Sequence, residues 1–175
     1  NIINRAEEER YVQSLMRTQE LTGWWPSGHV MIGNHAISVL ADAWAKGIRT
    51  FDPAKALEAY AHEAMNKGPW GGANGRAGWK EYWQLGYVPY PESMGSTAQT
   101  LEYAYDDWCI YTLGRALGKP ECEIAPYKER AMNYRNLYDA GSSLMRGRNE
   151  DGTFQSPFSP LKWGDAFTEG NSLHY

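Results

Sequence analysis

The sequence predicts an all-α protein in which paired helices are joined by long loops at one end. Apolar residues recur with the helical period through most of the chain. Glycines and prolines stand at the ends of these periodic segments, where helices begin and stop. Strict alternation of apolar and polar residues, which indicates strands, is weak, and the clearest turn signal of a hairpin is the stretch EDGT at residues 150–153.

Three helices are expected in the first 68 residues. Arg5 to Leu21 has an acidic first turn and an apolar face, which predicts an amphipathic helix. Ile32 to Lys46 has too many apolar residues for one stripe and therefore predicts a mostly buried helix. Asp52 followed by Pro53 indicates the start of a third helix with Asp as its N-cap, and Gly68 closes it.

The second half alternates long loops and helices. Pro69 to Pro91 is rich in glycine, tryptophan and tyrosine, which predicts a long loop packed against one end of the helical body. Ser96 can cap a helix that runs to about Leu117. A further helix is expected from about Ala125 to Tyr138, and the remainder is rich in turns.

Composition excludes several classes of function. The 175 residues fit one domain, here taken as residues 1–175, and the net charge of −4 argues against a nucleic-acid footprint. No apolar run reaches the ~20 residues that cross a bilayer, so no membrane span is expected. Cys109 and Cys122 have neither disulfide-framework nor metal-site spacing, and Cys109 is expected in the core. Eight Trp and twelve Tyr suit sugar rings, but they also suit a core.

The stretch STAQTLEYAYDDWCI, residues 96–110, places three carboxylates among large aromatics on one helix. Glu102 and Asp106 are four residues apart, where like charges repel by roughly 0.2–0.5 kcal/mol. Asp107 and Trp108 follow directly. The acids either complement the dipole at the start of the helix or serve a site, and the residues alone leave both interpretations open.

Other polar residues are candidates for chemistry. His35 lies on the predicted buried helix, where it is either a hydrogen-bonded core imidazole or a ligand. Glu169 lies in the stretch FTEGNS, where partial burial would raise its pKa, although an acid that caps a terminal helix fits the spacing equally well. Zinc-site and nucleophile-elbow motifs are missing from the sequence. Carboxylates with aromatics remain, and these are the groups that glycoside hydrolysis requires.

Several long motifs resemble a known family. HVMIGNHAISVLADAWAKGI, STAQTLEYAYDDWCIYTLGRALGK and AFTEGNSLHY closely resemble the calcium-dependent, exo-acting α-mannosidases of glycoside hydrolase family 92. RAMNYRNLYD and GRNEDGTFQSPFSP are also similar to that family, so the resemblance covers nearly the whole chain. It implies a partial (α/α)6 toroid of helical hairpins. It also implies release of terminal α-linked mannose from mannose-containing glycans with inversion, assisted by calcium.

The resemblance also implies roles for particular residues. Glu169 stands in the TEGN motif, where the general acid is expected, and Asn171 of the same motif is expected to bind substrate. The LEYAYDDW and HVMIGNHAISVLADAWAKGI motifs imply a set of residues that line or support the substrate pocket: Glu102, Asp106, Asp107, Trp108 and His35. Leu173 departs from the family, which usually has an aromatic residue there.

The resemblance further implies that the general base and most calcium ligands follow Tyr175, so that this chain is an internal, incomplete segment of the catalytic domain. We therefore expect the isolated 175 residues to be inactive, and the parent protein to be periplasmic or extracellular. Two alternatives stay open. One is a non-catalytic helical module that binds sugars or acts as a scaffold, and the other is a six-hairpin glycosidase with a different sugar specificity.

Overall fold

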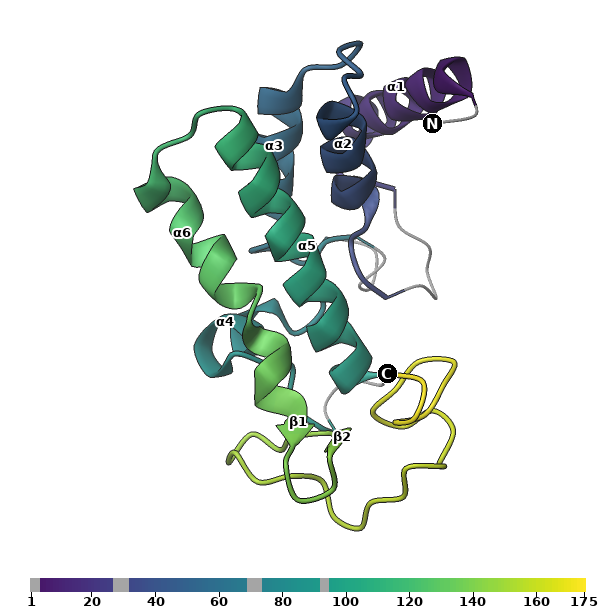
Figure 1. Ribbon diagram of the computed structural model, residues 1–175, viewed down its shortest axis with the longest axis vertical. Coiled ribbons are helices and arrows are strands. Elements are labelled where there is room, and N and C mark those ends of the chain that lie inside the picture. The colour runs from purple at the N-terminus through teal and green to yellow at the C-terminus, as the bar shows by residue number, and fades with distance from the viewer. Residues whose placement is uncertain (1–3, 27–31, 69–73, 92–94) are drawn as a thin grey trace.

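The structure is a computed structural model that describes residues 4–26, 32–68, 74–91 and 95–175, and Figure 1 shows its arrangement. The described part is mostly helical, which confirms the all-α prediction. Six α-helices occur in these ranges: α1 (Arg5–Thr22), α2 (Ala36–Ala45), α3 (Pro53–Glu63), α4 (Trp79–Leu85), α5 (Ser96–Ala116) and α6 (Glu121–Arg130). A 3₁₀ helix, η1 (Asn133–Leu137), is followed by the short strands β1 (Tyr138–Asp139) and β2 (Leu144–Met145).

Helix α5 is the centre of the packing, because it contacts α2, α3, α6 and η1. Figure 1 shows it running through the middle of the molecule with α6 alongside. The approach of α5 to α6 depends on Gly114, where a Cβ atom would lie 2.7 Å from Cγ2 of Ile124. A larger residue at this position would push the two helices apart.

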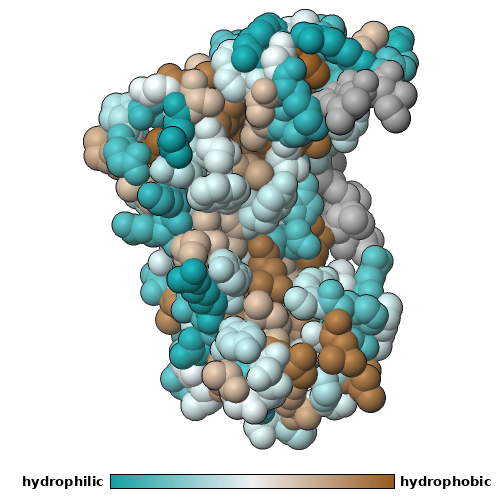
Figure 2. Space-filling model, viewed as in Figure 1, coloured by the Kyte–Doolittle hydropathy of each residue, from teal (hydrophilic) through white to brown (hydrophobic). Residues whose placement is uncertain are grey.

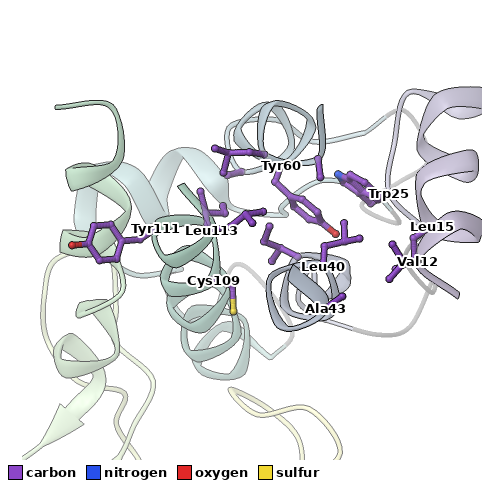
Figure 3. Packing of buried hydrophobic residues seen from close by; sticks show 14 of the residues in the cluster. Val12, Leu15, Trp25, Leu40, Ala43, Tyr60, Cys109, Tyr111 and Leu113 are labelled. Carbon is purple, nitrogen blue, oxygen red and sulfur yellow. The ribbon is translucent and has the colours of Figure 1, made fainter. Parts of the chain in front are cut away.

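The main core is formed by the apolar faces of α1, α2, α3, α5 and α6. Figure 3 shows Leu40 of α2 and Leu113 of α5 among its members. Trp25 lies in the same cluster and stacks on Tyr60, with ring centroids 4.6 Å apart and planes at 7°. A smaller cluster of Tyr82, Val88 and Tyr103 lies apart from it.

The first three predicted helices form with shifted ends. α1 agrees with the predicted segment to within a residue, and Asp52 caps α3 by accepting from the backbone N–H groups of Ala54 and Lys55. α2 begins later than predicted, at Ala36, because Asn34 and His35 form the turn that enters it. α3 ends at Glu63 rather than near Gly68.

Two predictions in the middle of the chain are wrong. The predicted loop from Pro69 to Pro91 contains α4, a short helix bounded by Gly78 and Gly86, while its residues 69–73 lie outside the described part. Ser96 is not the N-cap of α5, because Gly95 takes that position. The role of a capping side chain is filled by carbonyl groups from the C-terminal segment, described below.

The segment after α5 also differs from its prediction. The expected helix from Ala125 to Tyr138 is divided into α6 and η1, and α6 begins earlier, with Pro126 inside it. Ile124 and Tyr127 belong to the main core, so packing on α5 holds α6 in place despite the proline. The EDGT turn forms, since the Asn149 N–H donates to the Thr153 carbonyl at 2.8 Å.

Core packing makes a direct prediction. Replacing the fully buried Leu40 with Ala removes side-chain contacts between α2 and its neighbours, so the free energy of unfolding is expected to fall by about 2–5 kcal/mol. Leu21→Ala is the matched control, because Leu21 is 68% exposed, and its effect is expected within about 0.5 kcal/mol. Denaturant unfolding measures both, and equal effects would contradict the assigned core.

Candidate active site

The three carboxylates of α5 do not share one environment. Asp106 and Asp107 are both fully buried, while Glu102 is half-buried one turn earlier. Adjacent residues point about 100° apart on a helix, whereas residues four apart lie on the same face. Asp107 therefore faces one set of partners, and Glu102 and Asp106 together face another.

Asp107 is held between two arginines. Its Oδ1 accepts a hydrogen bond from Nη1 of Arg76 at 2.7 Å, and its Oδ2 accepts one from Nε of Arg130 at 2.9 Å. The guanidinium of Arg130 also lies over the ring of Trp83, 3.7 Å from its centroid. Both carboxylate oxygens are thus occupied inside the protein, and Asp107 is positioned to hold elements together rather than to touch a substrate.

Glu102 and Asp106 clamp the imidazole of His35. His35 Nδ1 lies 2.9 Å from Oδ1 of Asp106, and Nε2 lies 2.8 Å from Oε2 of Glu102. The hydrogen bond to Asp106, followed by the bond to Glu102, raises the pKa of His35 to about 10. The imidazole is therefore a cation at neutral pH, with both N–H groups donating, and it offsets the repulsion between the two acids.

A chain of buried hydrogen bonds connects Asp106 of this clamp to the core. The backbone N–H of Asn34 donates to Oδ2 of Asp106 at 2.9 Å, and the Asn34 side-chain amide donates to Glu63. Glu63 also accepts from the backbone N–H of Trp25, and burial raises the pKa of Glu63 to about 7. The roles of Asn34 and Glu63 could not be predicted from the sequence, because no local motif connects residues that are distant along the chain.

The C-terminal segment docks on the first turn of α5, and Figure 1 shows the C-terminus beside that end of the helix. The Asp165 carbonyl accepts from the N–H of Gly95 at 2.9 Å, and the Ala166 carbonyl accepts from the N–H of Thr97 at 2.9 Å. These bonds satisfy N–H groups that a helix start leaves unpaired. Gly95 is required there, since its φ is +79° and an added Cβ would overlap Oγ1 of Thr168.

Glu169 lies in a tight loop that the docked segment forms. The N–H of Gly164 donates to the Gly170 carbonyl at 2.8 Å, and this bond closes a loop of residues 164–170 that contains Glu169. Glu169 has a φ of +51°, a region that non-glycine residues rarely adopt and that is enriched at functional sites. The side chain is exposed, so the expected partial burial of Glu169 is wrong, and no terminal helix follows it among residues 170–175.

Tyr175 is hydrogen-bonded to the loop that carries Glu169. Its hydroxyl donates to the Thr168 carbonyl at 3.0 Å. The pKa of Tyr175 is raised first by burial, then by the negative charge of Glu102, and to a smaller degree by that of Glu169. The docking of residues 165 and 166 on the first turn of α5 brings this loop to the end of the helix that carries Glu102. The site thus combines an exposed acid with a carboxylate–imidazolium pair.

The other predicted residues lie differently. Asn171 stabilises the terminal turn, since its Oδ1 accepts from the N–H of Leu173 at 3.0 Å. Trp108 is 45% exposed. Its side chain lines a groove between α2 and α5 together with Trp44 and Tyr105, so the structure does not bring it to Glu102 or Glu169. Cys109 is buried, as predicted for a core residue.

Neither a group of metal-ligating side chains nor a helix that could span a membrane occurs within residues 4–26, 32–68, 74–91 and 95–175. No three His, Cys, Asp or Glu side chains of these ranges are grouped so that they could hold a metal ion. Calcium takes six to eight oxygen ligands, and Asp106 and Asp107 have theirs occupied by cations and N–H groups. None of the helices described here is long and apolar enough to cross a membrane.

The sequence as a whole matches one protein family. The match is to the glycosyl hydrolase family 92 catalytic domain, and it extends over residues 1–175. The chain belongs to glycosyl hydrolase family 92. The resemblance seen in the motifs is thereby confirmed.

Individual relatives agree with the family 92 assignment. A solved family 92 inverting mannosidase from Bacteroides thetaiotaomicron is 41% identical, with a TM-score of 0.91 over 96% of this chain. A family 92 α-mannosidase from the same organism, solved in complex with mannoimidazole, is 31% identical with a TM-score of 0.87 over 98% of this chain. An uncharacterized secreted glycosidase of Arthroderma benhamiae is 31% identical in an alignment 169 positions long that covers 86% of this chain.

This family 92 chain spans less than a quarter of those relatives. It covers 24% of each of the two mannosidase chains and 22% of the fungal glycosidase. Most of each relative therefore has no counterpart in the 175 residues.

The clamp on His35 makes a prediction about pH. Its pKa is raised in the folded state, so His35 stabilises the fold fully below about pH 6.5, and this contribution decreases as the pH rises to about 10. NMR titration of the imidazole is expected to place its midpoint near 10, and Glu102→Gln is expected to lower it. Glu129→Gln, an exposed change on α6, serves as the control. A midpoint near 6.5 in the unchanged protein would contradict the clamp.

Proposed function

We propose that the parent protein is an exo-acting α-mannosidase that hydrolyses terminal α-linked mannose from glycans, and that this chain supplies its general acid, Glu169. The observation that carries the proposal is that Glu169, exposed and at positive φ, lies in the loop docked on the first turn of α5, the helix whose Glu102 pairs with His35. Membership of family 92 supports the reaction class. The two similar Bacteroides thetaiotaomicron proteins are named as mannosidases, and one of them binds mannoimidazole.

Glu169 has the access that a general acid needs. Protonation of the glycosidic oxygen requires a carboxylic acid within hydrogen-bond reach of the leaving group, and an exposed side chain on a closed backbone loop can supply it. Positive φ constrains the direction in which the side chain leaves the backbone. The loop is fixed to α5 by the carbonyls of Asp165 and Ala166, so the acid is held relative to Glu102.

Glu102 and His35 suit the binding of sugar hydroxyl groups. One oxygen of Glu102 is bound to the His35 imidazolium, which orients the carboxylate and leaves its other oxygen to accept from a hydroxyl. Asp106 lies behind His35 and is fully buried, so it acts on the sugar through the imidazolium. Asn171 stabilises the turn after Glu169. We place Asp107 in the support of the site, because both of its oxygens bind arginines.

Inversion needs a second carboxylate that activates water on the opposite face of the sugar, roughly 6.5–9.5 Å from the acid. Glu102 is committed to His35, so we propose that the base belongs to another part of the parent. The same holds for calcium, since the described residues do not group enough oxygen ligands for it. The similarity to a secreted glycosidase supports export of the parent to the periplasm or the extracellular space.

Glu169→Gln in the parent protein tests the assignment. Removing the acidic proton is expected to slow release of mannose from α-linked mannosides by about 10²–10⁴-fold. Glu150→Gln is the matched control, because Glu150 is an exposed glutamate of the same C-terminal segment, and it is expected to leave the rate unchanged. Full activity of Glu169→Gln would exclude Glu169 as the acid. A parent that binds mannosides without turnover would instead favour a sugar-binding module.

The isolated 175 residues are expected to be inactive, because they hold the acid without the base. General acid assistance alone is worth about 10²–10⁴-fold, which is too little for turnover at a useful rate. Release of free mannose from a mannoside by the purified chain, measured beside the parent as a positive control, would contradict this expectation.

A further inference from the structure

Buried polar groups of this chain, unlike its surface residues, stay buried when the rest of the parent protein is added. Figure 2 shows apolar residues on the surface, among them a group at the lower right, where the C-terminal segment lies in Figure 1. The remainder of the parent can cover such residues. Glu63, by contrast, is 1% exposed within this chain alone, and further chain can only exclude more water from it.

Glu63, the last residue of α3, joins the two ends of the connection between α1 and α2. Its Oε1 accepts from the backbone N–H of Trp25, and its Oε2 accepts from the side-chain amide of Asn34. Both donors belong to buried residues, so each oxygen of the carboxylate is paired inside the protein. The carboxylate thus holds the turn that enters α2, in which Asn34 is followed directly by His35.

That turn carries the imidazole of the candidate site. The backbone N–H of Asn34 donates to Oδ2 of Asp106 at 2.9 Å, and Oδ1 of Asp106 lies 2.9 Å from Nδ1 of His35. A shift of Asn34 would therefore displace a donor to Asp106 and the residue that bears the imidazole at the same time. Because His35 in turn pairs with Glu102, the orientation of Glu102 depends on the turn that Glu63 holds.

From this geometry we propose that Glu63 is a positioning residue of the active site: through Asn34 it holds the imidazole of His35 in the clamp. The inference rests on the proposed function and extends it to a residue that acts through other side chains rather than on the sugar. Supporting groups of this kind fix the rotamers of the residues that meet a ligand, and a site without them is too loose.

The carboxylate of Glu63 is costly to keep in this place. Burial raises its pKa to about 7, although the hydrogen bonds from Asn34 and Trp25 and the positive charge of Arg76 oppose the rise. An amide of the same shape would avoid the cost of a buried charge, but it has one acceptor oxygen, whereas the carboxylate accepts from both N–H donors. Buried acids with shifted pKa values cluster at functional sites.

Glu63→Gln in the parent protein tests the assignment. Glutamine has the same shape, but its carbonyl oxygen accepts from one of the two donors while its amide group meets the other. The variant is expected to lower kcat/KM on α-linked mannosides by about 10–100-fold, the usual effect of removing a group that orients another. Glu58→Gln, the same change at an exposed residue of α3, is the matched control and is expected to leave the rate unchanged.

A swapped pair, Asn34→Asp with Glu63→Gln, keeps the test valid if the single variant folds poorly. In the double variant the carboxylate at position 34 accepts from the amide at position 63, and the carbonyl at position 63 accepts from the N–H of Trp25. The hydrogen bonds return with one of them reversed, so most of the activity is expected to return. Asn34→Asp alone sets two carboxylates against each other and is expected to lose activity.

Titration of the His35 imidazole distinguishes positioning from a purely structural role. Glu63→Gln is expected to lower its midpoint from about 10, because a displaced turn weakens the two hydrogen bonds that raise the pKa, and the swapped pair is expected to restore it. NMR of labelled histidine rings in the parent measures the midpoint, with His35→Gln to assign the signal. A midpoint that Glu63→Gln leaves unchanged would overturn the proposal.

Activity measurements separate this proposal from the proposed function. Rates are compared at a temperature well below the thermal midpoint of each variant, so that unfolding does not contribute. Equal kcat/KM values for Glu63→Gln and the unchanged parent would exclude Glu63 as a positioning residue, while the mannosidase assignment stands. A parent that releases no mannose would overturn the proposed function and the role of Glu63 in it, even where the imidazole midpoint responds.

Discussion

Asp106 and Asp107 are adjacent on α5, and both are fully buried. A buried carboxylate is tolerated when cations and N–H donors pair with it, and here the partners come from separate parts of the chain. Arg76 precedes α4 and Arg130 ends α6, while His35 enters α2. The two aspartates therefore fix three other segments around α5, and the arrangement of the candidate site depends on that.

The second constraint is the docking of the C-terminal segment on the N-terminus of α5. Carbonyls of Asp165 and Ala166 take the N–H groups at the start of the helix, and Gly95 leaves room for Thr168. This docking does for α5 what a capping side chain does elsewhere. It also carries Glu169 to the N-terminal end of α5, the end that bears Glu102, so that capping and placement of the acid result from the same contacts.

Several features could be predicted from the sequence because their causes are local. Asp52 and Pro53 start α3 through a cap and a fixed φ, and the apolar periodicity of α1 and α5 set their lengths within a few residues. The TEGN and LEYAYDDW motifs led to family 92, which the match over the whole chain confirms. The helix α4 was missed although Gly78 and Gly86 bound it, since its aromatics indicated a loop.

The sequence by itself thus determined the helical class, the starts of α1, α3 and α5, and the family, because periodicity, caps and motifs act over a few residues. Only the tertiary structure decided which acids meet which cations. Glu102 and Asp106 face His35 about seventy residues away, whereas Asp107, one residue later, faces Arg76 and Arg130. It also decided that Trp108 lines a groove between α2 and α5. Such pairings depend on how helices cross, and no spacing along the chain records that.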